Sequence, residues 1–195
     1  MLLNRGLRNC LSVGASYFAA TWLALICPAV VQAAGDAPSL LLVVRHAERA
    51  SNPADDPPLT EAGIQRAEAL AATLANAGVS VIITTQFKRT QETAKPLAKA
   101  LGLTPEIVPL SSAALDAHLK LLEAAVRRHP GKVVLVVGHE RSAPRLVNAI
   151  GGFGLGDICP QHYANLYSLS IIGQKAHLVH SRYGAADNVN GPGCP

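Results

Sequence analysis

The chain has 195 residues, of which 49% are apolar, 15% are charged and only 4% are aromatic. This length supports a single domain with its own core, and the high apolar content excludes an intrinsically disordered chain. The formal charge of +4 includes two arginines among the first 33 residues; without them, 15 basic residues face 13 acidic ones. So small a charge gives no reason to expect nucleic acid or a membrane surface as a partner.

The first 33 residues have the pattern of a secretory signal peptide. Arg5 and Arg8 are their only charges, and an uncharged apolar run follows over residues 9–34. Val31 and Ala33 then occupy the −3 and −1 positions of a cleavage site. We expect a signal peptide at 1–33, one domain at 34–195, export to the periplasm or medium, and no stable membrane insertion after cleavage. The uncharged run is also long enough for a retained membrane anchor, and this alternative stays open.

Two cysteines, Cys159 and Cys194, remain after the signal segment is removed. An even, low cysteine count in an exported chain predicts a disulfide, because the compartment is oxidising. We therefore expect a bridge between them that ties the C-terminal tail to the body of the domain.

Apolar runs and helical patterns alternate along the remaining chain. Buried strands are predicted at 39–44, 79–84 and 133–137, a short edge strand at 106–110, and a hairpin at 166–172 and 176–181. Helices are predicted at 60–77, 88–101, 113–129 and 144–150. Thr60 caps the first helix, and Pro96 is expected to kink or split the second. This alternation indicates the α/β class.

Histidines and arginines follow the three buried strands. Arg45 and His46 follow the first strand, Arg89 comes soon after the second, and His139 and Glu140 follow the third. Sites in open α/β sheets form beyond the carboxyl ends of the strands, so these side chains should converge. Arginine matches phosphate oxygens with its planar fork, and a neutral imidazole can attack phosphorus. The pattern predicts phosphoryl transfer through a phosphohistidine.

Four segments carry a family resemblance: V-R-H-A-E at 44–48, P-L-T-E-A-G-I-Q-R-A at 58–67, T-Q-F-K-R-T-Q-E-T-A at 85–94 and V-G-H-E at 137–140. Their order and spacing resemble the histidine phosphatase superfamily, branch 1, the phosphoglycerate-mutase-like proteins, over roughly residues 39–180. The resemblance implies a three-layer α/β/α sandwich with a mostly parallel central sheet. Thr85 stands where relatives often have serine, which keeps the hydroxyl.

The resemblance also implies roles for individual residues. His46 would be the phosphorylated nucleophile, and Arg45, Arg89 and His139 would complete the phosphate pocket. Asn52, six residues after His46, falls where some relatives place an asparagine that contacts the phosphate.

The proton donor for the leaving group is less defined. A leaving alkoxide needs a proton, so a carboxylic acid is expected near the site. Glu140 directly follows His139, in a position that resembles the acid of other branches of the superfamily. The stretch between Arg89 and His139 offers Glu106, Asp116 and Glu123. Glu140 is the preferred donor and Asp116 the alternative; a phosphoramidate substrate would need such an acid less.

Three further charged residues lie close to these motifs. Glu48 is expected to pair with Arg45 or Arg89, with a catalytic role as the alternative. Arg141 and Arg145 would either hold a second anionic group of the substrate or line a solvated helix face.

We therefore expect a phosphatase that needs neither metal nor cofactor and hydrolyses a phosphomonoester or phosphoramidate, either a small phosphorylated molecule or a phosphorylated glycan or protein. A metal hydrolase using His46, Glu48 and His139 is an alternative, although no C-x-x-C follows to complete a deaminase zinc site. A non-catalytic phosphate- or partner-binding module on the same fold is the other. The sequence leaves the oligomeric state open.

Overall fold

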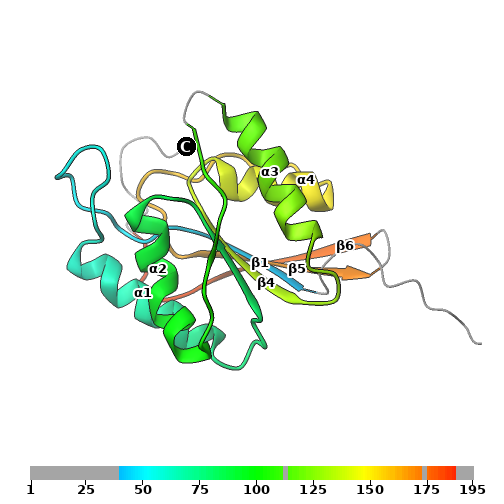
Figure 1. Ribbon diagram of the computed structural model, residues 1–195, viewed down its shortest axis with the longest axis horizontal. Coiled ribbons are helices and arrows are strands. Elements are labelled where there is room, and N and C mark those ends of the chain that lie inside the picture. The colour runs from blue at the N-terminus through cyan, green and yellow to red at the C-terminus, as the bar shows by residue number, and fades with distance from the viewer. Residues whose placement is uncertain (1–39, 112–113, 173–174, 188–195) are drawn as a thin grey trace, which may run out of the picture. The chain divides into compact units, whose positions relative to one another are not determined.

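The computed structural model describes residues 40–111, 114–172 and 175–187 (Figure 1). These residues contain a sheet of six strands: β1 (Leu40–Arg45), β2 (Val81–Thr84), β3 (Glu106–Ile107), β4 (Val133–Gly138), β5 (Asn165–Ile172) and β6 (Lys175–Arg182). The helices are α1 (Glu61–Leu74), α2 (Lys88–Leu101), α3 (Leu115–Arg127) and α4 (Ser142–Gly151). The expected signal peptide lies outside the described residues.

The strand order β3-β2-β4-β1-β5-β6 makes the centre of the sheet parallel. β1 and β2 both pair with β4 in the parallel sense, and β3 pairs with β2 in the same sense. β5 runs antiparallel to β1, and β6 antiparallel to β5. Arg45 at the end of β1 is in register with Gly138 at the end of β4, so the residues that follow these strands emerge side by side.

Helices cover both faces of the sheet, as Figure 1 shows. Leu41 and Val43 of β1 pack in a core with α3 and α4, whereas Leu42 and Val44 pack with α1 and α2 on the other face. The alternation follows from the two-residue period of a strand, and it explains why an uninterrupted apolar run was needed at this position. The predicted three-layer α/β/α sandwich with a mostly parallel sheet is confirmed.

Most predicted elements are present with shifted ends. Thr60 caps α1 as predicted, because its Oγ1 accepts a hydrogen bond of 3.1 Å from the Gly63 amide. α2 is one helix that contains Pro96, so of the two expected effects of this proline, a kink or a split, the split does not occur. The edge strand β3 is shorter than predicted, and the hairpin of β5 and β6 is present.

Gly63 allows α1 to approach the segment after β1 closely. A Cβ atom at this position would overlap the carbonyl oxygen of Glu48, which is backbone and has little room to move. The amide of Thr60 donates to the same carbonyl at 2.9 Å. The start of α1 is thereby fixed against the residues that follow His46.

None of the helices in the described ranges is both long enough and apolar enough to cross a membrane.

Candidate active site

The two predicted histidines meet at the carboxyl edge of the sheet. His46 follows β1 and His139 follows β4, and the amide of His46 donates to the Gly138 carbonyl at 2.9 Å. The two imidazole rings lie edge to face with their centroids 5.4 Å apart. Both side chains are buried, with 2% of His46 and 7% of His139 exposed. The parallel register of β1 and β4 produces this pairing.

The ring of His46 is held in one orientation. Its Nδ1 lies 2.8 Å from the carbonyl oxygen of Ala47. Because a carbonyl only accepts hydrogen bonds, Nδ1 carries the proton and Nε2 keeps its lone pair. Burial lowers the pKa of His46 well below its ordinary value; the bond to Ala47 opposes this shift, and the neighbouring Arg45 charge adds to it. His46 is therefore neutral at neutral pH and has a free nucleophilic nitrogen.

His139 is fixed by hydroxyl groups on both sides. Its Nε2 lies 3.1 Å from Thr85 Oγ1, and its amide donates to Ser142 Oγ at 3.0 Å. Thr85 is itself buried and bonded to the hydroxyl of Thr90. Burial, together with the nearby Arg89 charge, lowers the pKa of His139 to about 3. This imidazole is also neutral near pH 7.

Arg45 is held mainly by uncharged groups. Its Nη1 donates to the carbonyl oxygens of Cys159 and Pro160 at 3.0 and 2.8 Å. Its Nη2 donates to Glu140 Oε2 at 3.1 Å, and its guanidinium lies 4.2 Å from the centroid of the Tyr163 ring. The Nε of Arg45 is buried and has no hydrogen-bond partner among the described residues. A phosphate oxygen is the kind of acceptor that this donor lacks.

Arg89 is supported in a similar way from α2. Its guanidinium lies 4.2 Å from the centroid of the Phe87 ring, and Phe87 also contacts the ring of His139 edge to face. Asp56 is a distant ion-pair partner at 4.0 Å. The Nε of Arg89 is also buried without a partner in the described part of the chain. The sequence reasoning did not identify the supporting rings of Phe87 and Tyr163.

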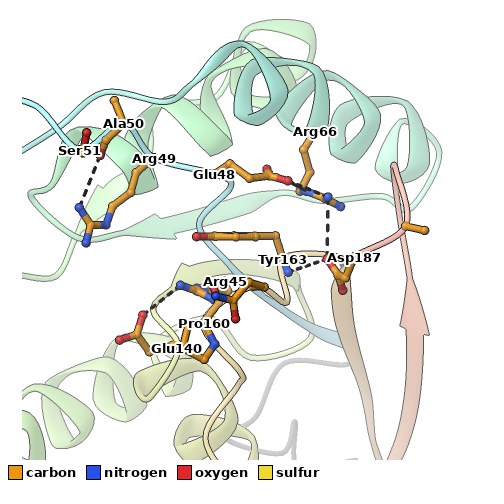
Figure 2. A pocket seen from close by; sticks show the side chains of 12 residues that line it. Arg45, Glu48, Arg49, Ala50, Ser51, Arg66, Glu140, Pro160, Tyr163 and Asp187 are labelled. Atoms are coloured by element: carbon orange, nitrogen blue, oxygen red, sulfur yellow. Dashed lines mark hydrogen bonds and ion pairs between the residues drawn. The ribbon is translucent and has the colours of Figure 1, made fainter. Parts of the chain in front are cut away.

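Two cavities adjoin these residues. The smaller, of about 220 Å³, is lined by His46, Arg89, His139, Glu140 and Arg141 among others. The larger, of about 660 Å³, is lined by Arg45 and Tyr163, and Figure 2 shows it from close by. Glu140 lines both cavities, and 48% of its side chain is exposed. The structure thus brings the predicted nucleophile, arginines, second histidine and preferred acid to one place.

Other predicted residues do not join this group. Asn52 is exposed and lines neither cavity, which is at odds with the expected phosphate contact. Asp116 is exposed in the first turn of α3 and also lines neither cavity. Arg141 and Arg145, considered for a second anionic group, both pair with Asp157 at 3.6 and 3.2 Å.

The remaining candidate acids between Arg89 and His139 also have partners of their own. Glu106 pairs with Arg128 and His129, and Glu123 pairs with Arg127 one turn further along α3. Of Glu106, Asp116, Glu123 and Glu140, only Glu140 lines the cavity that both histidines also line.

Glu48 has a different partner from the one expected. It pairs with Arg66 of α1 at 2.8 Å, not with Arg45 or Arg89. Arg66 also lies 3.8 Å from Asp187, whose Oδ1 accepts from the amide of Tyr163 at 2.8 Å. Figure 2 shows this chain of contacts along one wall of the larger cavity. It connects the residues after β1 to α1 and to the segment that carries Tyr163.

Cys159, one of the two cysteines expected to be bridged, is disulfide-bonded. Cys194 lies outside the described residues. Within the described ranges, no cluster of three or more His, Cys, Asp or Glu side chains is arranged to hold a metal ion.

Comparisons with known proteins agree with this geometry. The model of the histidine phosphatase superfamily (branch 1) matches residues 41–110. A probable phosphoglycerate mutase GpmB of Yersinia pestis (strain Pestoides F) is 44% identical over 68 residues, and that of Yersinia pseudotuberculosis serotype O:1b is equally similar. The match covers 32% of this chain and 32% of the relative, so the chain spans about a third of the length of the curated relatives it matches.

Solved structures show the same fold. The protein histidine phosphatase SixA complexed with tungstate aligns with a TM-score of 0.59 and 18% identity, covering 73% of this chain and 96% of that one. A putative alpha-ribazole-5'-P phosphatase from Escherichia coli aligns with a TM-score of 0.56 and 17% identity, covering 74% and 96%. Residues 41–110 of this chain are thus similar to branch 1 of the histidine phosphatase superfamily, and the chain shares the fold of solved histidine phosphatases.

Proposed function

We propose that this chain is a phosphatase that hydrolyses a phosphomonoester or phosphoramidate through a phosphohistidine at His46, without a metal ion. The observation that carries the proposal is the neutral, buried His46. Its Nε2 lone pair is free because Nδ1 donates to the Ala47 carbonyl. Arg45 and Arg89 each have a buried Nε donor without a partner in the described part of the chain, and transfer of a dianionic phosphoryl group requires such donors.

In the first step, His46 Nε2 attacks phosphorus, the N–P bond forms and the bond from phosphorus to the leaving oxygen breaks. Arg45 and Arg89 stabilise the charge on the phosphoryl oxygens while this occurs. Glu140 gives its proton to the leaving oxygen, because it lines the cavity that contains both histidines. In the second step, Glu140 accepts a proton from water, which attacks phosphorus and breaks the N–P bond to release phosphate.

The direct test is turnover of p-nitrophenyl phosphate by residues 34–195 in the presence of EDTA. We expect turnover in EDTA and a loss of at least about a thousandfold in His46→Ala. After rapid quenching with phosphorus-labelled substrate, wild type should carry an acid-labile label that His46→Ala lacks. His177→Gln, a change of an exposed histidine on β6, is the matched control and should match wild type.

Three results would contradict the proposal. Turnover that persists in His46→Ala would exclude this nucleophile, and turnover that disappears in EDTA would favour the metal hydrolase. No turnover of any ester by a folded protein would leave the non-catalytic binding module.

The role of Glu140 has its own test. An alkyl leaving group needs a proton, whereas p-nitrophenolate leaves readily without one. We therefore expect Glu140→Gln to lower kcat for an alkyl phosphate about a hundredfold and kcat for p-nitrophenyl phosphate much less. Asp116→Asn is the matched control, since Asp116 was the alternative acid. An equal loss on both substrates would show that Glu140 acts by holding Arg45 and not as an acid.

We also propose that the protein is exported and that residues 1–33 are removed. The basic, apolar and small-residue segments of the N-terminus support this, as does the disulfide at Cys159, because such bonds persist in oxidising compartments. N-terminal sequencing of protein from the periplasm or medium should begin at Ala34. A protein that keeps residue 1 and sediments with membranes would instead identify a retained anchor.

A further inference from the structure

We propose that the larger cavity beside Arg45 receives the leaving group of the substrate, and that this group is uncharged and rich in hydroxyls, as in a sugar or polyol phosphate. The inference rests on the proposed function, since it assigns the phosphoryl group to the smaller cavity. It adds a second binding site and a substrate class.

The two cavities meet where the leaving oxygen must depart. Arg49 and Glu140 line both of them, so the two spaces adjoin at these two side chains. The ring of Tyr163, which lines the larger cavity, lies 6.2 Å from the ring of His46. A phosphoryl group at His46 with its leaving oxygen at Glu140 directs the rest of the substrate into the larger cavity.

The charges of the two cavities differ. The smaller is lined by three arginines and one carboxylate, Glu140, beside two neutral histidines, which suits a phosphoryl dianion. The larger is lined by three arginines and three carboxylates, among them Glu48 and Asp187. An anionic leaving group would gain nothing from so balanced a lining.

The arginines of the larger cavity are also largely occupied. Arg66 is bound by Glu48 and Asp187, and it donates to two backbone carbonyls. Arg45 is bound by Glu140 and by carbonyl oxygens. Of these three arginines, Arg49 alone forms no ion pair in the part of the chain that the structure describes. A second phosphate or carboxylate would therefore find a single exposed cation.

The hydrogen-bonding groups of the larger cavity fit hydroxyls. Gln161 lines it, and its Oε1 is buried with no partner among the described residues, so it needs a donor. Arg49 and Ser51 offer donors at the same site. Figure 2 shows Tyr163 extending between Glu48 and Arg45, so that polar groups surround an aromatic ring. A hydroxyl both donates and accepts, and a volume of about 660 Å³ is within the range of small-molecule sites.

The test measures binding to the His46→Ala protein, in which catalysis cannot consume the ligand. Isothermal titration calorimetry would compare a hexose 6-phosphate with inorganic phosphate, glycerol 3-phosphate, a hexose 1,6-bisphosphate and a phosphoserine hexapeptide. We expect the hexose 6-phosphate to bind at least about tenfold more tightly than inorganic phosphate, and the bisphosphate to bind no better than the monophosphate. Gln161→Leu should remove most of this tenfold difference, while Glu123→Gln on α3 should preserve it.

If Gln161→Leu does not fold, Ser51→Trp serves in its place, because Ser51 is exposed at the cavity and a bulky side chain there would fill it. Equal affinity for the hexose phosphate and inorganic phosphate would overturn the inference, as would preference for the bisphosphate or the peptide. Failure of the proposed function is a separate result. It would appear as absence of phosphate ester hydrolysis by the wild-type protein, whereas this experiment measures only binding to the His46→Ala protein.

Discussion

Arg45 and Arg89 each lie over an aromatic ring, and Arg45 also donates to backbone carbonyls. Arg45 lies over Tyr163 and Arg89 over Phe87, at the same distance of 4.2 Å from guanidinium carbon to ring centroid. A neutral support holds the guanidinium plane without cancelling its charge, and that charge then remains available to a phosphate. Burial lowers the pKa of both arginines from their ordinary values, but each remains cationic at any working pH.

Tyr163 should therefore act as a positioning residue for Arg45. A cation–π contact of this kind contributes about 1 kcal/mol, so Tyr163→Leu is expected to weaken competitive inhibition by inorganic phosphate about fivefold. Tyr163→Phe keeps the ring and should restore the inhibition constant. An inhibition constant that changes equally in both variants would show that the hydroxyl, not the ring, matters.

The buried histidines should make stability depend on pH. The folded pKa of His139 is about 3, below its unfolded value near 6.5. The unfolded chain therefore binds more protons between these values. The contribution of neutral His139 to the free energy of unfolding is fully present above about pH 6.5. It is lost as the pH falls toward 3, on the order of 1 kcal/mol per pH unit.

Urea unfolding at pH 7 and pH 5 measures this loss. His139→Gln cannot take up the proton, so its free energy of unfolding should fall less between the two values than that of wild type. The His177→Gln variant, changed at an exposed histidine, should lose as much free energy of unfolding between pH 7 and pH 5 as wild type does. If all three proteins lose the same free energy of unfolding between pH 7 and pH 5, His139 is not the source of the pH dependence of stability.

At the scale of elements, the packing of α1 against the residues after β1 sets the position of His46. Gly63 makes this packing possible, because a Cβ atom there would overlap the Glu48 carbonyl. We expect Gly63→Ala to lower the free energy of unfolding by about 1–3 kcal/mol and to reduce kcat by displacing the His46 segment. Ala69→Gly, elsewhere on α1, is the comparison for helix propensity alone. Unchanged kcat in a destabilised Gly63→Ala protein would separate the packing from the site.

The strand-end motifs were predictable from the sequence because the carboxyl ends of parallel strands share an edge. Two apolar runs followed by His46 and His139 were enough to pair these residues. The partner of Glu48 was not predictable, because Arg66 reaches it only through the close approach of α1 at Gly63. Tyr163 was missed for a similar reason, since its segment is far from Arg45 in the sequence and carries no periodic pattern.

At the scale of the whole molecule, the disulfide at Cys159 links the redox state of the compartment to the phosphate site. The Cys159 carbonyl accepts from Arg45 Nη1 at 3.0 Å, so the bridge anchors part of the backbone that holds this arginine. Reduction should lower the free energy of unfolding by about 2–4 kcal/mol and raise KM, because Arg45 loses a fixed partner. Thermal unfolding and kinetics with and without dithiothreitol measure both effects. Cys159→Ser should already show them and should not respond to the reductant. If KM is unchanged when the bridge is reduced, the disulfide stabilises the fold without positioning Arg45, and activity would survive in a reducing compartment.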